Sequence, residues 1–103
     1  MKNKTKQAHL IGICGAGMSA LAILLKEAGW KITGSDSNFY EPISGYLKKN
    51  KISFAKNYRA ENIPKDVDLI VIGKHAELLP EKNKEVKQAF KSDLKIKSLS
   101  ETL

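Results

Sequence analysis

A glycine-rich loop followed by an acidic residue gives this sequence its clearest chemical signal. The stretch GICGAGMSA places Gly15, Gly17 and Ala20 in G-x-G-x-x-G/A spacing, after an apolar run and before a helical pattern. Such glycines let the backbone turn tightly and approach a diphosphate, which amides at the helix N-terminus bind without a basic side chain. Asp36 follows Gly17 by roughly twenty residues, where an acid accepts hydrogen bonds from ribose hydroxyls. The pattern therefore predicts a nucleotide site.

Each of these residues also has a simpler interpretation. The glycines could form only a tight strand-to-helix turn, and GSDSN is good turn composition, so Asp36 could be an exposed turn residue. Ser35 and Asn38 are suited either to a sugar or to capping that turn. We expect Met18 to pack beneath the loop, with only its backbone amide available to a ligand.

A second group of candidate residues lies in GKHAELLP, after the fourth predicted strand. In an open parallel sheet this loop borders the crevice at the carboxyl ends of the strands, where Lys74 and His75 could meet an anion or a sugar. A solvated loop remains the alternative for Lys74. His9 is expected to be structural. The sequence shows no nucleophile–base pair, paired carboxylates, metal-ligand spacing or G-x-x-x-x-G-K-[ST] loop, so it predicts a binding site without catalytic residues.

Alternating apolar and helical segments predict the elements that position this site. Helical patterns cover residues 18–28, a segment beginning near Pro42 and a segment beginning at Pro80. One helical turn is possible within residues 56–66. The pattern predicts an α/β, Rossmann-like open sheet of five parallel strands in the order 3-2-1-4-5, with helices on both faces. The predicted strands are AHLIGI, WKITGS, KISFA, VDLIVIG and LKIKSL.

Composition narrows the class of protein. A length of 103 residues with 42% hydrophobic residues and three prolines predicts one globular domain over 1–103, with 1–7 as a basic tail. No apolar run approaches the roughly 18 residues of a membrane span, and we expect a cytoplasmic protein. The net charge of +7 comes from dispersed lysines, so we expect no nucleic-acid partner. The single cysteine, Cys14, excludes an intrachain disulfide and is expected to be a small apolar residue.

Several segments together resemble a known family. The stretch HLIGICGAGMSALAILLKEAGWKITGSD is similar to the N-terminal signature of the Mur ligases that act on UDP-N-acetylmuramate: a strand, a glycine loop followed by GMS, a helix and a strand ending in GSD. SNFYEPISGYL, DLIVIGKHAELLPEKNKEV and LKIKSLSETL resemble later segments of the murein peptide ligases. The resemblance covers nearly the whole chain, from about His9 to Leu103, although GKHA differs from the SSA or GNA of many relatives.

The resemblance implies that this domain binds the UDP part of UDP-N-acetylmuramate. It assigns the diphosphate to one group of residues, the uridine to a second and the rim of the crevice to a third. The residues assigned to the diphosphate are Gly15, Ala16, Gly17, Met18 and Ser19. Those assigned to the uridine are Ser35 and Asp36, and those assigned to the rim are Asn38, Lys74, His75 and Ala76.

In complete Mur ligases, the resemblance further implies, a central domain binds ATP and magnesium and phosphorylates the lactoyl carboxylate. An amine then attacks the acyl phosphate, and a third domain helps to bind that amine. We expect this chain to lack both later domains, to carry no cofactor of its own and to be inactive alone. The amine substrate stays open between L-alanine and murein tripeptide, with NFYEPIS favouring the tripeptide.

Two other function classes share the predicted fold. One is an NAD(P)-binding domain of an oxidoreductase, and the other is a noncatalytic nucleotide-sensing module, such as the regulatory domain of a transporter. A dinucleotide site commonly uses two mononucleotide halves, whereas a UDP-sugar needs one diphosphate cradle and one nucleoside pocket. The five-strand pattern therefore favours the UDP-sugar.

Overall fold

Four parallel strands form the centre of the molecule. A computed structural model describes residues 5–37, 41–73, 78–91 and 95–98. The strands are β1 (Gln7–Ile11), β2 (Lys31–Ser35), β3 (Leu69–Ile72) and β4 (Lys95–Ser98), in the sheet order β2-β1-β3-β4. Ile11 pairs with Ser35 on one side and with Ile72 on the other, so these strands end together.

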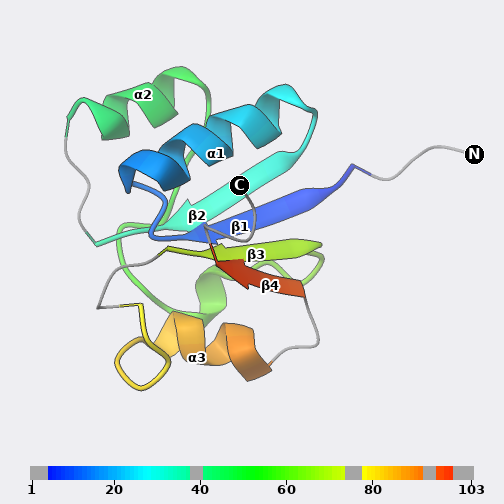
Figure 1. The fold of residues 1–103 in the computed structure, drawn as a ribbon, viewed down its shortest axis with the longest axis vertical. Helices are drawn as coiled ribbons and strands as arrows, with labels where there is room; N and C mark the ends of the chain where they lie inside the picture. The colour runs from blue at the N-terminus through cyan, green and yellow to red at the C-terminus, as the bar shows by residue number, and fades with distance from the viewer. Residues whose placement is uncertain (1–4, 38–40, 74–77, 92–94, 99–103) are drawn as a thin grey trace, which may run out of the picture.

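Helices cover both faces of this sheet, as predicted. Helices α1 (Ala16–Glu27) and α2 (Ile43–Lys49) lie on one face, and α3 (Lys84–Lys91) lies on the other (Figure 1). A short 3-10 helix, η1 (Ala60–Asn62), supplies the helical turn expected between residues 56 and 66 and packs against α3. No helix among the described residues is long and apolar enough to cross a membrane.

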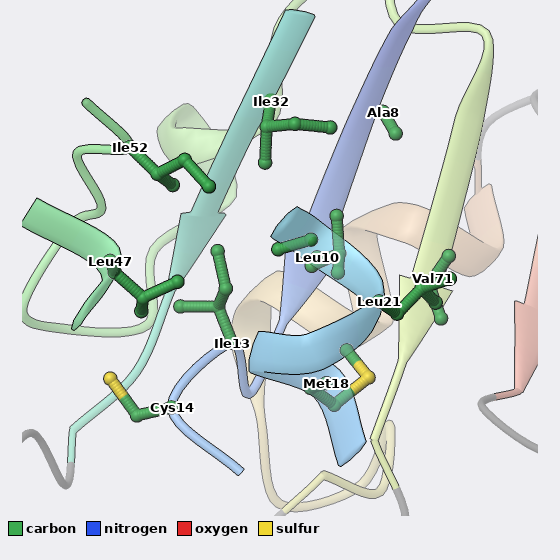
Figure 2. Packing of buried hydrophobic residues seen from close by; sticks show 11 residues of the cluster. Ala8, Leu10, Ile13, Cys14, Met18, Leu21, Ile32, Leu47, Ile52 and Val71 are labelled. Atoms are coloured by element: carbon green, nitrogen blue, oxygen red, sulfur yellow. The ribbon is translucent and has the colours of Figure 1, made fainter. Parts of the chain in front are cut away.

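Alternation along the buried strands divides the core into two layers. Leu10 of β1 and Val71 of β3 point toward α1, where they meet Leu21 (Figure 2). Ile11 and Ile70 belong instead to the cluster beneath α3. Because successive side chains of a strand point to opposite faces, nearly continuous apolar runs are required for a sheet covered on both sides.

The sheet differs from the prediction in one strand. Residues 51–55, expected to form the third strand in chain order, make one isolated parallel bridge, between Ala55 and Ser35. The prediction of five strands is therefore wrong for the described residues, although the order of the other four is confirmed. The start of this segment completes the end of α2 instead, since the amides of Lys51 and Ile52 donate to carbonyls of Lys48 and Leu47.

The third long helix also begins later than predicted. Pro80 lies in a turn, and α3 starts at Lys84, because the Asn83 side chain accepts hydrogen bonds from the amides of Glu85 and Val86. Asparagine is a strong N-cap because its side-chain oxygen replaces the missing acceptor of the first turn. Phe90 of α3 is 57% exposed.

Candidate functional site

The glycine loop follows β1 at the edge where the strands end. The chain passes from β1 through α1 to β2 on one side, whereas β3 lies on the other side of β1 and leads to α3 on the opposite face (Figure 1). The strand order thus reverses between β1 and β3. Open α/β sheets bind ligands outside the carboxyl ends of the strands at such a reversal.

Gly12 makes the turn that carries the chain out of β1. Its φ of +86° lies in the left-handed region, and a Cβ there would lie 2.7 Å from Cδ1 of Leu78. Its amide donates to the carbonyl oxygen of Ser35 at 2.8 Å, and the Ile13 amide donates to the same oxygen at 3.1 Å. The loop therefore lies directly against the end of β2. Gly34 permits this approach, because a Cβ there would meet Ile13 and the carbonyl oxygen of Leu10 within 3 Å.

The N-terminus of α1 carries the feature best suited to an anion. Its N-cap is Gly15, which is exposed and offers no side-chain hydrogen bond, and the first turn contains no acidic residue. The first intrahelical bond in this turn runs from the Ser19 amide to the Gly15 carbonyl, at 2.8 Å. The amides of Ala16, Gly17 and Met18 therefore precede the helical ladder, and such amides attract anions. By contrast, Asn83 already caps α3.

Asp36 is buried at the end of β2, with 6% exposure, rather than lying in an exposed turn. Its Oδ2 accepts a hydrogen bond from the Cys14 amide at 2.9 Å, and its Oδ1 accepts one from the Tyr58 hydroxyl at 3.2 Å. Its own amide donates to the Ala55 carbonyl at 3.0 Å. The carboxylate therefore fixes the start of the glycine loop.

Ser35 is fully buried, and its side chain is directed toward α3. The hydroxyl donates to Oε2 of Glu85 at 2.7 Å, and Nε2 of His9 lies 2.6 Å from the same oxygen. Oε1 of Glu85 accepts from the Arg59 amide at 3.1 Å and from the Asn62 side chain at 2.8 Å. A fully buried carboxylate thus joins β1 and β2 to α3, and His9 makes the buried contacts expected of a structural residue.

The negative charge of Asp36 changes the acidity of two neighbours. Burial, together with this charge, raises the pKa of the Cys14 thiol to about 11. The same two causes raise the pKa of the Tyr58 hydroxyl to about 12, although hydrogen bonds with Ser37 oppose the shift. At neutral pH Cys14 is therefore a protonated, buried thiol, as expected of a small apolar residue, and Tyr58 remains a hydrogen-bond donor.

Comparison with known proteins decides the family. A family model described as "Mur ligase family, catalytic domain" matches residues 7–103.

The chain belongs to the Mur ligase family. It is 38% identical over 105 residues to the UDP-N-acetylmuramate–L-alanine ligase of Clostridium botulinum strain Eklund 17B, covering 100% of this chain and 21% of that protein. It is 42% identical over 65 residues to the UDP-N-acetylmuramate–L-alanyl-γ-D-glutamyl-meso-2,6-diaminoheptandioate ligase of Escherichia coli K12, covering 63% of this chain and 14% of that protein.

Solved structures of Mur ligases share the fold. The murein peptide ligase of Psychrobacter arcticus superposes with a TM-score of 0.78 at 27% identity, over 88% of this chain and 18% of that one. The UDP-N-acetylmuramate–alanine ligase of Thermotoga maritima gives a TM-score of 0.77 at 27% identity, over 93% of this chain and 21% of that one. The chain spans 14% to 21% of the length of these relatives.

The structure brings together only part of the predicted Mur ligase site. The glycine loop, Ser35 and Asp36 meet at one edge of the sheet, and Met18, 2% exposed, packs in the core as expected. The predicted rim residues Asn38, Lys74, His75 and Ala76 lie outside the described residues. Within the described ranges, no group of three or more His, Cys, Asp or Glu residues could hold a metal ion.

Sequence reasoning missed Tyr58 and Glu85. Both lie in polar stretches that look solvated: Tyr58 in the connection after the predicted strand at residues 51–55, and Glu85 in the predicted helix that begins at Pro80. The sequence holds one signal that could have indicated a buried Glu85. It stands two residues after an asparagine that serves as an N-cap, and next to the buried Val86. Nothing in the local pattern of Tyr58 indicates that its hydroxyl reaches Asp36.

Proposed function

We propose that this chain is the UDP-N-acetylmuramate-binding domain of a Mur ligase, and that the α1 N-terminus holds the diphosphate. The open first turn of α1, capped by a glycine at the carboxyl edge of the sheet, carries this proposal. The relatives that match this chain are named as ligases of UDP-N-acetylmuramate, which supports this choice of nucleotide. The backbone around Gly15, Ala16, Gly17, Met18 and Ser19 would face the diphosphate.

The uridine is proposed to lie beyond the end of β2, beside Asp36. Asp36 already accepts from Cys14 and Tyr58, so a nucleoside would share this carboxylate with protein donors. The Ser35 hydroxyl donates to Glu85, so it would have to break that hydrogen bond to donate to uridine. Asn38, Lys74, His75 and Ala76 stay predictions for the rim.

The whole enzyme is proposed to join UDP-N-acetylmuramate to an amine through an ATP-dependent amide bond. Either L-alanine or murein tripeptide fits this role, since relatives of both kinds match the chain. The described residues supply no donor set suited to magnesium, and the sequence has no ATP-binding glycine loop, so they do not fit Mg-ATP. We assign ATP and magnesium to the remainder of the ligase, and propose a cytoplasmic location for the whole protein.

Thermal unfolding with added nucleotides tests the binding function. A ligand at 100 times its dissociation constant stabilises the folded state by about 2.7 kcal/mol, which moves the midpoint of a domain of this size by roughly 10–20 °C. UDP-N-acetylmuramate and UDP should both raise the midpoint, and NADH at the same concentration should not. A shift with NADH alone would contradict the proposal and favour an oxidoreductase domain.

A further inference from the structure

We propose that Tyr58 is a positioning residue for the phosphate-binding loop and acts through Asp36. This inference rests on the proposed UDP site and adds to it a residue outside the glycine loop and outside β2. Tyr58 belongs to the connection between residue 55 and β3, which lies on the α3 side of the sheet and packs with the second core layer.

The Asp36 carboxylate connects two parts of the chain that are distant in sequence. One oxygen receives the Cys14 amide at 2.9 Å and the other receives the Tyr58 hydroxyl at 3.2 Å. With 6% exposure, Asp36 has little access to water that could replace either donor. Charge-assisted hydrogen bonds of this kind are stronger than neutral ones, so the Tyr58 hydroxyl restricts the orientation from which Asp36 holds Cys14.

The loop amides next to Cys14 are held by the same end of β2. Gly12 and Ile13 donate to the Ser35 carbonyl, so three consecutive amides are bonded to Ser35 and Asp36. Gly15, the N-cap of α1, follows Cys14 directly. A change in the Asp36 orientation is therefore transmitted over one peptide bond to the helix terminus that is proposed to bind phosphate.

The connection that carries Tyr58 is itself fixed by the second buried carboxylate. The Arg59 amide and the Asn62 side chain both donate to Oε1 of Glu85. Residues 58–62 therefore contact two buried acids at once, Asp36 on the loop side and Glu85 on the α3 side. This double attachment gives the Tyr58 hydroxyl a defined position, as a positioning residue requires.

Tyr58→Phe removes this hydroxyl and keeps the ring, and Tyr46→Phe is the matched control. Tyr46 lies on α2 and is 60% exposed. Titration calorimetry with UDP should show a Kd about 2- to 10-fold weaker for Tyr58→Phe, the range that corresponds to one hydrogen bond. Tyr46→Phe should bind UDP as the wild type does.

A spectroscopic measurement separates positioning from a general loss of stability. The ¹H resonance of the Cys14 amide reports its hydrogen bond to Asp36, and it should shift in Tyr58→Phe but not in Tyr46→Phe, with or without UDP. A lower unfolding midpoint with an unchanged Cys14 resonance and unchanged UDP affinity would overturn the positioning role. Failure of the wild type to bind UDP would instead overturn the proposed function, while the Cys14 resonance would still test the link from Tyr58 to the loop.

Discussion

Truncation of Glu85 provides the most direct test of the buried network. In Glu85→Ala, four donors that the structure places on this carboxylate lose their acceptor: Nε2 of His9, Oγ of Ser35, the Arg59 amide and the Asn62 side chain. A buried donor left without a partner costs about 1–3 kcal/mol, and several such donors share this site. We therefore expect a loss of about 3–5 kcal/mol, a large part of the 5–15 kcal/mol typical of a native protein.

Urea unfolding followed by circular dichroism measures this loss. The matched control is Glu81→Ala, which removes an exposed carboxylate in the turn before α3 and should change stability by no more than about 0.5 kcal/mol. Glu85→Gln should lie between Glu85→Ala and the wild type. It keeps an oxygen for Arg59 and Asn62, whereas its new amide NH₂ group must donate to His9 and Ser35. That requires the other tautomer of the His9 ring and a rotated Ser35 hydroxyl.

Two results would refute this reasoning. A loss below about 1 kcal/mol in Glu85→Ala would mean that the four hydrogen bonds to this carboxylate contribute little beyond what water provides. A Glu85→Gln variant less stable than Glu85→Ala would show that the His9 and Ser35 side cannot rearrange. If Glu85→Ala fails to fold, Glu85→Gln still measures the network, because it retains the side-chain volume.

Two further predictions concern the glycine loop. Because the pKa of Cys14 is about 11 in the folded protein and 9.0 for the ordinary thiol, the folded state binds more protons between these values, and its stability should fall as pH rises from 9 to 11. Urea titrations should show this decline at up to about 1.4 kcal/mol per pH unit relative to Cys14→Ala, and parallel curves would exclude it. Gly12→Ala should destabilise the protein by about 1–3 kcal/mol, because its φ is +86° and the new methyl would contact Leu78. Thermal unfolding checks this against Gly29→Ala, which has a φ of +98° but no atom within 4 Å of the added Cβ, so equal losses would exclude a contribution from the Leu78 contact.

The sequence predicted the parts of the fold that depend on local pattern. Continuous apolar runs identified β1 and β3, and the glycine spacing after β1 located the turn into α1. The prediction of a strand at residues 51–55 was wrong because the first amides of this segment donate to carbonyls at the end of α2. No pattern of apolar residues indicates such a contact. The predicted start of α3 was wrong because Pro80 and Asn83 are both residues that favour a helix start. Only the hydrogen bonds from the amides of Glu85 and Val86 to the Asn83 side chain decide between them.

The sequence by itself therefore determined the glycine loop, the acid at the end of β2 and the resemblance to the Mur ligases. These follow from residue type and spacing along one stretch of chain. The tertiary structure alone decided that Asp36 holds Cys14, that Ser35 is directed to α3, and that Tyr58 and Glu85 reach the ends of the strands. Those contacts join residues 22 to 50 positions apart, and they depend on burial, which removes water as the competing partner.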